Sequence, residues 1–262
     1  MSLVPISISI ITHNESARIR PCLESVAWAD EIVVVDAESD DDTVSICREF
    51  TDRIYIRPWP GFARQKQFAL DQCRNEWVLS VDADERVRPD LAEEIQTIIP
   101  QAGAVNGYRI ARRSYFLGRW IQHCGWYPGY QVRLFKRLCT RVSEARVHEG
   151  FLVSGDLGVL DGALDHFSHG TLAESLDKMN RYSSLEALDR LERKRVRAID
   201  FIIHPLAAFS RKYFSLSGYR DGMPGLLLCW ISALVNMATY MKLWRLQRMS
   251  AEELQSARER HW

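Results

Sequence analysis

Asp82 and Asp84 stand one residue apart, directly after the apolar run 77–81. That run, Trp-Val-Leu-Ser-Val, fits a buried strand. Two carboxylates at the end of such a strand present oxygen ligands of the kind that Mg²⁺ and Mn²⁺ prefer, and a cation bound this way takes further ligands from substrate phosphates. An Asp-x-Asp pair alone is common in acidic loops, so the strand before it carries most of the weight. The pair therefore predicts a divalent-metal site.

Two more polar clusters follow apolar runs near the amino terminus. Residues 12–15 follow the run 6–11, and the acidic stretch 36–42 follows the run 32–35. Buried strands that alternate with helical stretches predict a mostly parallel central sheet with helices on both faces. Ligands of such sheets bind outside the carboxyl ends of the strands, so the three acidic clusters are expected to meet at one rim. The helical stretches lie at 15–26, 42–50 and 64–74.

Asp and Ser after a strand are also ordinary helix caps, and we keep that interpretation for Asp42 and Ser16. After residue 100 the pattern changes. Residues 106–170 mix alternating strands with an aromatic, Gly-containing loop, and the chain then becomes helical and basic. We expect a catalytic domain over 1–185 and a helical, basic and apolar region over 186–262.

The net charge is zero, but its distribution is uneven. Residues 1–100 hold 19 acidic and 10 basic residues, and the remainder holds 15 and 24. An acidic half suits a cation or sugar hydroxyls, and a basic half suits phosphates or an anionic lipid surface, although chance placement gives the same counts. The six cysteines lie far apart without a Cys-x-x-Cys pair, and the apolar start lacks a basic leader. Both features favour a reduced, cytoplasmic protein.

Several motifs occur in a fixed order over residues 5–185, and together they resemble the family 2 glycosyltransferases with a GT-A fold. Within that family the chain is similar to the branch typified by lipopolysaccharide core glycosyltransferases. The order of the motifs is far more specific than any one of them. They lie at 9–15, 31–36, 39–43, 77–85, 125–128, 131–135 and 147–149.

The resemblance implies roles for residues at the strand ends and on the helix before the metal strand. It implies that Asp82, Asp84 and His166 hold the metal, although a single His is more often a hydrogen-bonded structural residue. For Arg64 and Lys66 a solvated helix face is an equally good interpretation. The implied nucleotide-binding residues are Thr12, Asn14, Glu15, Asp36, Arg64, Lys66 and Asp82.

The resemblance also implies a catalytic base and an acceptor surface. Glu149, in Val-His-Glu, matches the position of the acidic base in this branch, although a surface Glu after a strand is the plainer interpretation. Trp126 and Tyr127 would hold the acceptor, or simply belong to a core. The chain departs from the branch at Gly129, where relatives commonly carry an acidic residue, so a metal or acceptor role for that loop position is in doubt.

The resemblance implies transfer of a sugar from a nucleotide diphosphate donor to a glycolipid such as lipopolysaccharide core. The transfer would invert the anomeric configuration and depend on Mg²⁺ or Mn²⁺, and UDP is the expected nucleotide of the donor. The alternatives are a polyprenyl-phosphate glycosyltransferase and a non-catalytic scaffold docked on the membrane. No nucleic-acid partner is expected, and self-association into a homo-oligomer stays open. The chain lacks the glycine-rich signatures of dinucleotide-binding enzymes and P-loop NTPases and the serine-hydrolase elbow. Arg86 breaks the phosphatase pattern that Asp82 would otherwise begin.

The stretch 223–241 is uncharged and apolar, and its 19 residues are just long enough to cross a bilayer. Basic residues flank both of its ends, whereas a spanning helix shows such an excess mainly on the cytoplasmic side. Ser232, Asn236 and Thr239 recur at helical spacing, which predicts a polar stripe along one face of this helix. We therefore expect attachment to the inner face of the cytoplasmic membrane without spanning, with a soluble helical subdomain as the alternative.

Overall fold

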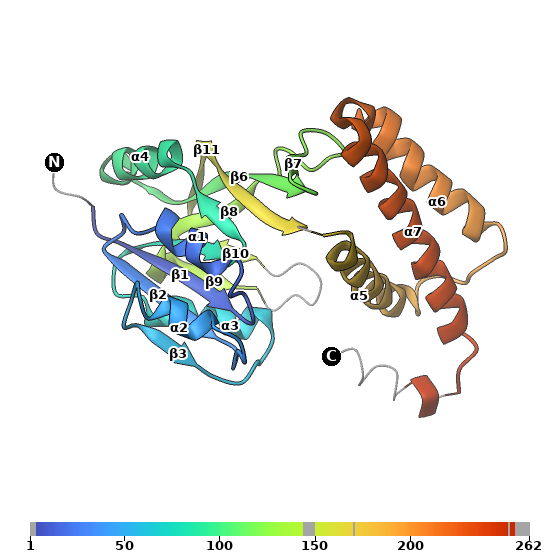
Figure 1. Ribbon diagram of the computed structural model, residues 1–262, viewed down its shortest axis with the longest axis horizontal. Helices are drawn as coiled ribbons and strands as arrows, with labels where there is room; N and C mark the ends of the chain where they lie inside the picture. The colour runs from blue at the N-terminus through green and yellow to red at the C-terminus, as the bar shows by residue number, and fades with distance from the viewer. Residues whose placement is uncertain (1–3, 144–149, 170, 251, 255–262) are drawn as a thin grey trace. The chain divides into compact units, whose positions relative to one another are not determined.

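The computed structural model describes residues 4–143, 150–169, 171–250 and 252–254 (Figure 1). The chain divides into two compact units. Met1–Ser114 and Pro128–Ser168 form the first, and Tyr115–Tyr127 and His169–Trp262 form the second. The expected boundary at 185/186 falls inside helix α5 (Leu172–Arg190), which belongs wholly to the second unit.

The first unit is built on one sheet with the strand order β3-β2-β1-β4-β8-β6-β11-β5. Strands β1 (Ile6–Thr12), β2 (Glu31–Asp36), β3 (Ile54–Ile56) and β4 (Trp77–Asp82) are parallel. The predicted α/β architecture is confirmed, with the parallel part extended by antiparallel strands. These are β5 (Glu85–Val87), β6 (Val105–Phe116), β8 (Gln131–Lys136) and β11 (Asp156–His169).

Helices cover both faces of this sheet. Alternate residues of each strand point to opposite faces, so each face presents its own set of apolar side chains to the helices. Ile6, Ile8 and Ile10 pack in one apolar cluster with α1 (Ile19–Ser25), α2 (Thr43–Cys47) and α4 (Pro89–Ile98). The other face, with Val33, Val35 and Val78, packs against α3 (Phe62–Gln72). Every residue of β2 is buried, which explains why its sequence is continuously apolar rather than alternating. A separate two-stranded sheet pairs β9 (Thr140–Val142) antiparallel with β10 (Phe151–Val153).

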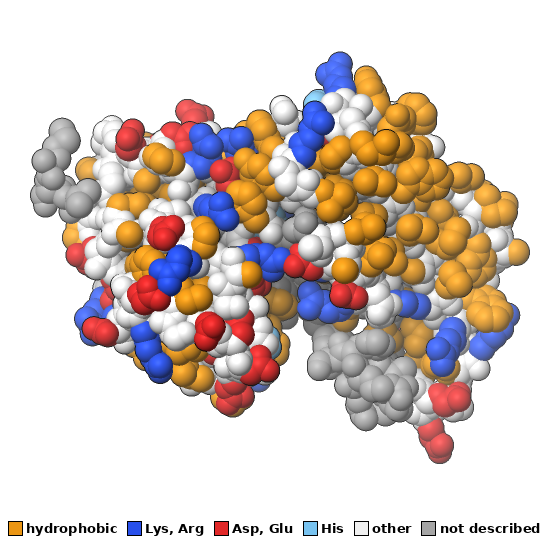
Figure 2. All heavy atoms as spheres, viewed as in Figure 1, with side chains coloured by type: hydrophobic (Ala, Val, Ile, Leu, Met, Phe, Trp, Pro, Cys, Tyr) orange, Lys and Arg blue, Asp and Glu red, His pale blue; other side chains and the backbone are white. Residues whose placement is uncertain are grey.

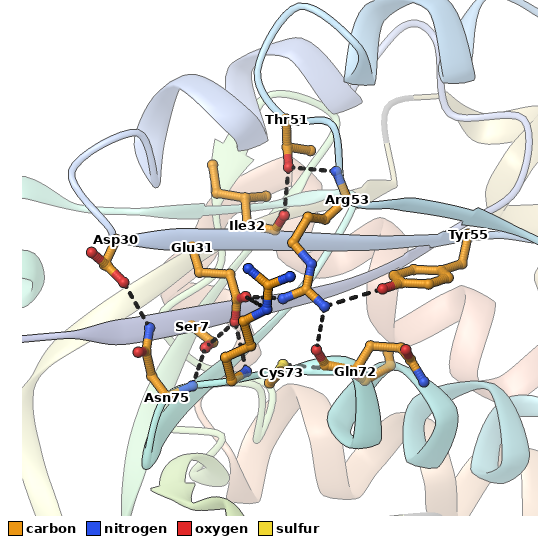
Figure 3. Close-up of polar contacts among 12 residues, drawn as sticks. Ser7, Asp30, Glu31, Ile32, Thr51, Arg53, Tyr55, Gln72, Cys73 and Asn75 are labelled. Atoms are coloured by element: carbon orange, nitrogen blue, oxygen red, sulfur yellow. Dashed lines mark hydrogen bonds and ion pairs between the residues drawn. The ribbon is translucent and has the colours of Figure 1, made fainter.

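Glu31 ties together the amino-terminal ends of the strands (Figure 3). Its carboxylate accepts hydrogen bonds from the Ser7 hydroxyl and the Arg74 backbone N–H and pairs with the Arg53 guanidinium. Arg53 also donates to the Gln72 carbonyl at 2.7 Å. Glu31, Arg53 and Arg74 border a hollow of about 390 Å³. Because their polar atoms are bonded to one another, we interpret the cluster as structural.

Replacing Glu31 by Ala should lower the free energy of unfolding by about 3–5 kcal/mol, because Arg53 would keep a largely buried charge without its counter-ion. Urea unfolding followed by circular dichroism measures this change. Glu49→Ala is the matched control, since Glu49 pairs with Arg20 at 2.6 Å on the exposed surface and should matter little. Equal stabilities of the two variants would show that the Glu31 cluster does not hold the strand ends together.

The second unit consists mainly of helices α5, α6 (Asp200–Ser210) and α7 (Gly222–Leu246). A Thr171–Glu174 capping box starts α5. A π-helical turn (Arg211–Ser215) and a 3₁₀ turn (Gly218–Asp221) reverse the chain between α6 and α7. The turn lies so close to α7 that a Cβ on Gly225 would stand 2.2 Å from the Gly218 carbonyl oxygen. A short strand, β7 (Arg119–Trp120), pairs with the end of β6 in this unit.

Candidate active site

Asp82 ends β4 on the face of the sheet that α3 covers. Its carboxylate lies between two cations: Lys66 Nζ is 3.1 Å from Oδ1, and Arg133 Nη2 is 2.6 Å from Oδ2. Arg133 comes from β8, which pairs antiparallel with β4. The same guanidinium nitrogen lies 2.7 Å from the Glu85 carboxylate, which also accepts the Asp82 backbone N–H. A cation from the helix and a cation from the neighbouring strand thus meet at the end of β4.

Burial and charge act against each other in this group. Burial alone would raise the pKa of Asp82, but the charges of Arg133 and Lys66 hold that pKa well below its ordinary value. Glu85 is fully buried, and burial raises its pKa in spite of Arg133. The pKa of Arg133 is lowered by burial but raised on balance by the charges of Asp82 and Glu85. Asp82 is therefore kept ionised, as a metal ligand must be.

Asp84 and His166 form the second part of the site. Strand β11 pairs with β5 and places His166 opposite Glu85 in the register. His166 Nε2 lies 3.4 Å from Asp84 Oδ2, and its Nδ1 lies 3.3 Å from the Ser114 hydroxyl. The Phe167 N–H donates to the Asp84 carbonyl at 2.9 Å. The Ser114 hydroxyl on Nδ1 orients the imidazole, as the second partner of a metal-binding histidine does, and Nε2 is the ring nitrogen that faces the Asp84 carboxylate.

The residues at this rim suit a divalent cation in kind. Two carboxylates and an imidazole match Mg²⁺ or Mn²⁺, with substrate phosphates supplying the other ligands. Among the described residues, no group of three or more His, Cys, Asp or Glu side chains is close enough to hold a metal by itself. Asp84 and His166 lie together, whereas Asp82 is engaged by Lys66 and Arg133. Metal binding through all three would need Asp82 to exchange a cationic partner.

The ends of β1 and β2 form the neighbouring part of the rim, with Thr12 opposite Asp36. The fully buried Asp36 accepts hydrogen bonds from the Ser39 N–H at 2.8 Å and from its hydroxyl at 2.6 Å. Thr12 is also buried, and its hydroxyl finds no hydrogen-bond partner within the described parts of the chain. A buried hydroxyl of this kind is a natural contact for a ligand group.

Asn14 and Glu15 join the β1 end to the loop after β2. Asn14 adopts a positive φ of 52°, accepts the Asp40 N–H at 3.0 Å and donates its own N–H to Ser39. The Glu15 carboxylate lies 3.2 Å from Arg18. Asp41, which sequence reasoning passed over, accepts the N–H groups of Ser16 and Thr43. Burial alone would raise the pKa of Asp41, but these hydrogen bonds lower it.

The two basic residues predicted on α3 differ in position. Lys66 lies at the carboxylates, whereas Arg64 is exposed on the helix. Gln65, between them, is fully buried, and neither atom of its amide has a hydrogen-bond partner in the described part of the structure. Arg133 and Glu85 lie within the motifs at 131–135 and 77–85, but sequence reasoning assigned neither of them a role in the site. A further signal for Arg133 was its position in the alternating run 131–135, which puts it on the same face as Phe135.

The remaining predicted residues are Trp126, Tyr127 and Glu149. Trp126 and Tyr127 belong to the second unit. Trp126 packs edge-to-face on Phe116, with 6.3 Å between the ring centroids, and Tyr127 packs in the same way on Trp120, with 5.2 Å between them. Within that unit both serve as packing residues, whatever else they contact. Glu149 lies outside the described residues.

Comparison with known proteins gives a consistent set of similarities. The profile of glycosyl transferase family 2 matches residues 7–148. A lipopolysaccharide core biosynthesis glycosyltransferase, LpsC, of Rhizobium meliloti is 33% identical over 95% of both chains. An uncharacterized glycosyltransferase of Rickettsia prowazekii is 30% identical over 94% of this chain and 87% of its own. The crystal structure of S. aureus TarS 1-349 in complex with UDP-GlcNAc is 14% identical at a TM-score of 0.47, covering 98% of this chain and 92% of that one.

Proposed function

This chain belongs to glycosyl transferase family 2 and is a glycosyltransferase with the predicted GT-A fold, and we propose that it moves a hexose from a UDP-linked donor to a glycolipid acceptor with inversion. The acceptor proposed is lipopolysaccharide core or a similar lipid-linked glycan, by analogy with the Rhizobium relative. The observation that supports the proposal most is the grouping of Asp82, Asp84, His166 and Lys66 at the end of β4.

Each of these residues has a task that its surroundings suit. Arg133 keeps Asp82 ionised, and Ser114 orients the imidazole that lies beside Asp84. Mg²⁺ or Mn²⁺, held by Asp82, Asp84 and His166, would supply Lewis-acid stabilisation of the leaving diphosphate. We assign Lys66 to the diphosphate as a charge-assisted donor.

The other proposed contacts concern the nucleoside and the acceptor. Thr12 and Asp36, side by side at the rim, would contact the nucleoside, with Asn14 and Glu15 shaping the loop around it. Arg64 stays a predicted contact for the donor, and Trp126 and Tyr127 stay predicted contacts for the acceptor.

The chemical step that we propose is a direct displacement. Glu149 takes the proton from an acceptor hydroxyl while the oxygen attacks the anomeric carbon. The bond to the acceptor forms as the bond to the diphosphate oxygen breaks, and the attack comes from the opposite side. An α-linked donor therefore gives a β-linked product. We place this reaction at the inner face of the cytoplasmic membrane, where a glycolipid acceptor is presented.

The donor can be found by thermal stabilisation with a panel of nucleotide sugars, with and without Mn²⁺, because a ligand that binds only the folded chain raises its melting temperature. We expect one UDP-sugar to stabilise the chain, and to do so only weakly in the presence of a chelator. Stabilisation by no nucleotide sugar, together with no transfer to glycolipid, would contradict the proposed function and favour a non-catalytic scaffold.

Lys66→Met tests the diphosphate assignment. Loss of one charge-assisted contact should weaken UDP binding by roughly 10- to 100-fold, since hydrogen bonds to charged groups contribute about 1.5–3 kcal/mol. Calorimetric titration with UDP and Mn²⁺ gives the affinity. Arg64→Met is the companion variant from the same helix, and its effect decides whether Arg64 shares this role. Unchanged UDP affinity in Lys66→Met would assign Lys66 to the structure alone.

A further inference from the structure

Helix α7 carries an apolar stripe that the second unit does not cover. Its members recur every three or four residues, so they fall on one side of the helix. Each is 37–64% exposed. Exposed Ile202, Ile203 and Leu206 of α6, the helix that packs on α7, add to it, and Figure 2 shows hydrophobic side chains gathered over these helices. This apolar face comprises Met223, Leu227, Trp230, Leu234, Met237, Met241 and Trp244 with the three α6 residues.

The other side of α7 is fixed to its own unit. The Lys242 ammonium donates to the Asn180 carbonyl and to the hydroxyls of Ser183 and Ser184 on α5. At the start of the helix, buried Asp221 accepts the N–H groups of Gln122 and His123. The predicted polar stripe of Ser232, Asn236 and Thr239 falls on the side opposite the apolar face, where each side chain donates to a carbonyl of α7 itself.

Length and composition alone would let the segment Gly218–Leu246 cross a membrane, and a third of its most apolar window is buried. The packing argues against crossing. Helix α5 lies along α7 and carries charged residues throughout, including Asp177, Arg181 and Asp189. A spanning α7 would draw these charges into the hydrocarbon, which costs about 2.5–3.5 kcal/mol or more for each. Only the apolar face, on the side of α7 away from α5, is suited to lipid.

The charges around the apolar face are almost all positive. Residues 192–248 contain ten Lys or Arg and three acidic residues, and the two Asp residues among the acidic ones are buried. Exposed Arg220 lies just before α7, and Arg245 and Arg248 lie at its end. A hollow of about 320 Å³ beyond the end of α7 is lined by three basic residues, Arg193, Lys194 and Arg195, and one acidic residue, Glu192. Such a rim attracts anionic headgroups and repels a second copy of the same surface.

We infer that the apolar face of α6 and α7 lies in the interfacial layer of an anionic membrane, parallel to its plane, with the basic rim on the lipid phosphates. Trp230 and Trp244 suit this depth, because indole rings favour the boundary between headgroups and acyl chains. The inference goes beyond the proposed function, since lipid binding needs neither donor nor acceptor.

Flotation of the full chain with phosphatidylcholine vesicles, with and without phosphatidylglycerol, tests this inference. The chain should bind the anionic vesicles, release in high salt or carbonate, and bind the neutral ones weakly. The double variant Leu234→Ser/Met241→Ser should bind at least ~10-fold less, because two exposed apolar side chains are lost from the inserted face. Leu138→Ser/Leu152→Ser is the matched control: both residues are exposed in the first unit, and their replacement should leave binding unchanged.

The charge of the rim is tested separately. Arg245→Glu should reduce binding to anionic vesicles by roughly tenfold, since each basic residue near the surface contributes about 1 kcal/mol. Arg48→Glu, an exposed change in the first unit, should not. Equal flotation of the Leu234/Met241 variant and wild type would overturn the inference. Resistance of the bound chain to carbonate would also overturn it, because that result indicates a spanning helix. A third contrary result would be a wild-type chain that does not float and is a dimer, while the Leu234/Met241 variant is a monomer.

Discussion

Glu149→Gln should slow sugar transfer by about two to four orders of magnitude while leaving donor affinity nearly unchanged. Gln keeps the size and shape of the side chain but cannot take the proton of the acceptor hydroxyl. Steady-state transfer rates together with UDP titration separate the two effects. The choice of Glu149 rests on the Val-His-Glu resemblance, because this residue lies outside the described part of the chain.

Glu144→Gln is the control for that experiment, because it makes the same chemical change five positions earlier, before the Val-His-Glu motif. It should transfer at the wild-type rate. A Glu149→Gln enzyme within a few fold of wild type would remove Glu149 from the role of base. A parallel loss of donor affinity would assign it to donor binding instead.

Asp84→Asn should abolish metal-dependent donor binding and with it nearly all transfer, because the site loses a charged oxygen ligand. The fold should persist, since the Asp84 carboxylate lies beside His166, and that imidazole keeps its contact with the Ser114 hydroxyl. Calorimetric titration with UDP should show an affinity that Mn²⁺ no longer raises. Asp90→Asn, on the exposed start of α4, is the control and should keep the metal effect.

The same substitution at Asp82 should behave differently. Asp82 neutralises buried Arg133 and contacts Lys66, so Asp82→Asn removes a counter-ion as well as a ligand. A loss of stability is therefore expected there but not in Asp84→Asn. If Asp84→Asn keeps full, chelator-sensitive turnover, Asp84 is not a metal ligand.

The parallel half of the sheet could be predicted because its evidence is local. The runs before Thr12, Asp36 and Asp82 are buried strands, and a helix follows each of the first two in the chain. Parallel strands bring their carboxyl ends to one rim, so this part of the candidate site follows from the order of the elements. The prediction that these residues share a rim is confirmed in their register.

The antiparallel half could not be predicted in the same way. Arg133 reaches Asp82 only because β8 inserts beside β4, and 51 positions of chain separate the two residues. Likewise, His166 reaches Asp84 through the pairing of β11 with β5. Pairing between distant strands depends on side-chain packing across the whole sheet, which no local pattern records.

Sequence periodicity also left open which side of α7 faces the rest of its unit. Ser232, Asn236 and Thr239 predicted a polar stripe along one face, and their hydroxyl and amide groups bond to carbonyls of the helix itself. The exposed side is apolar. The positions of α5 and α6, which pack on α7, decide which side of α7 is covered. The spacing of polar residues within α7 carries no information about those positions.

The configuration of the product tests the central claim most directly. Purified enzyme, the UDP-sugar found by the thermal screen, Mn²⁺ and a lipopolysaccharide-core acceptor should give a product whose new linkage is read by proton NMR. The account predicts a β linkage from an α-linked donor, and no product when the metal is chelated. A retained α linkage, or transfer that continues at full rate with chelator, would contradict it.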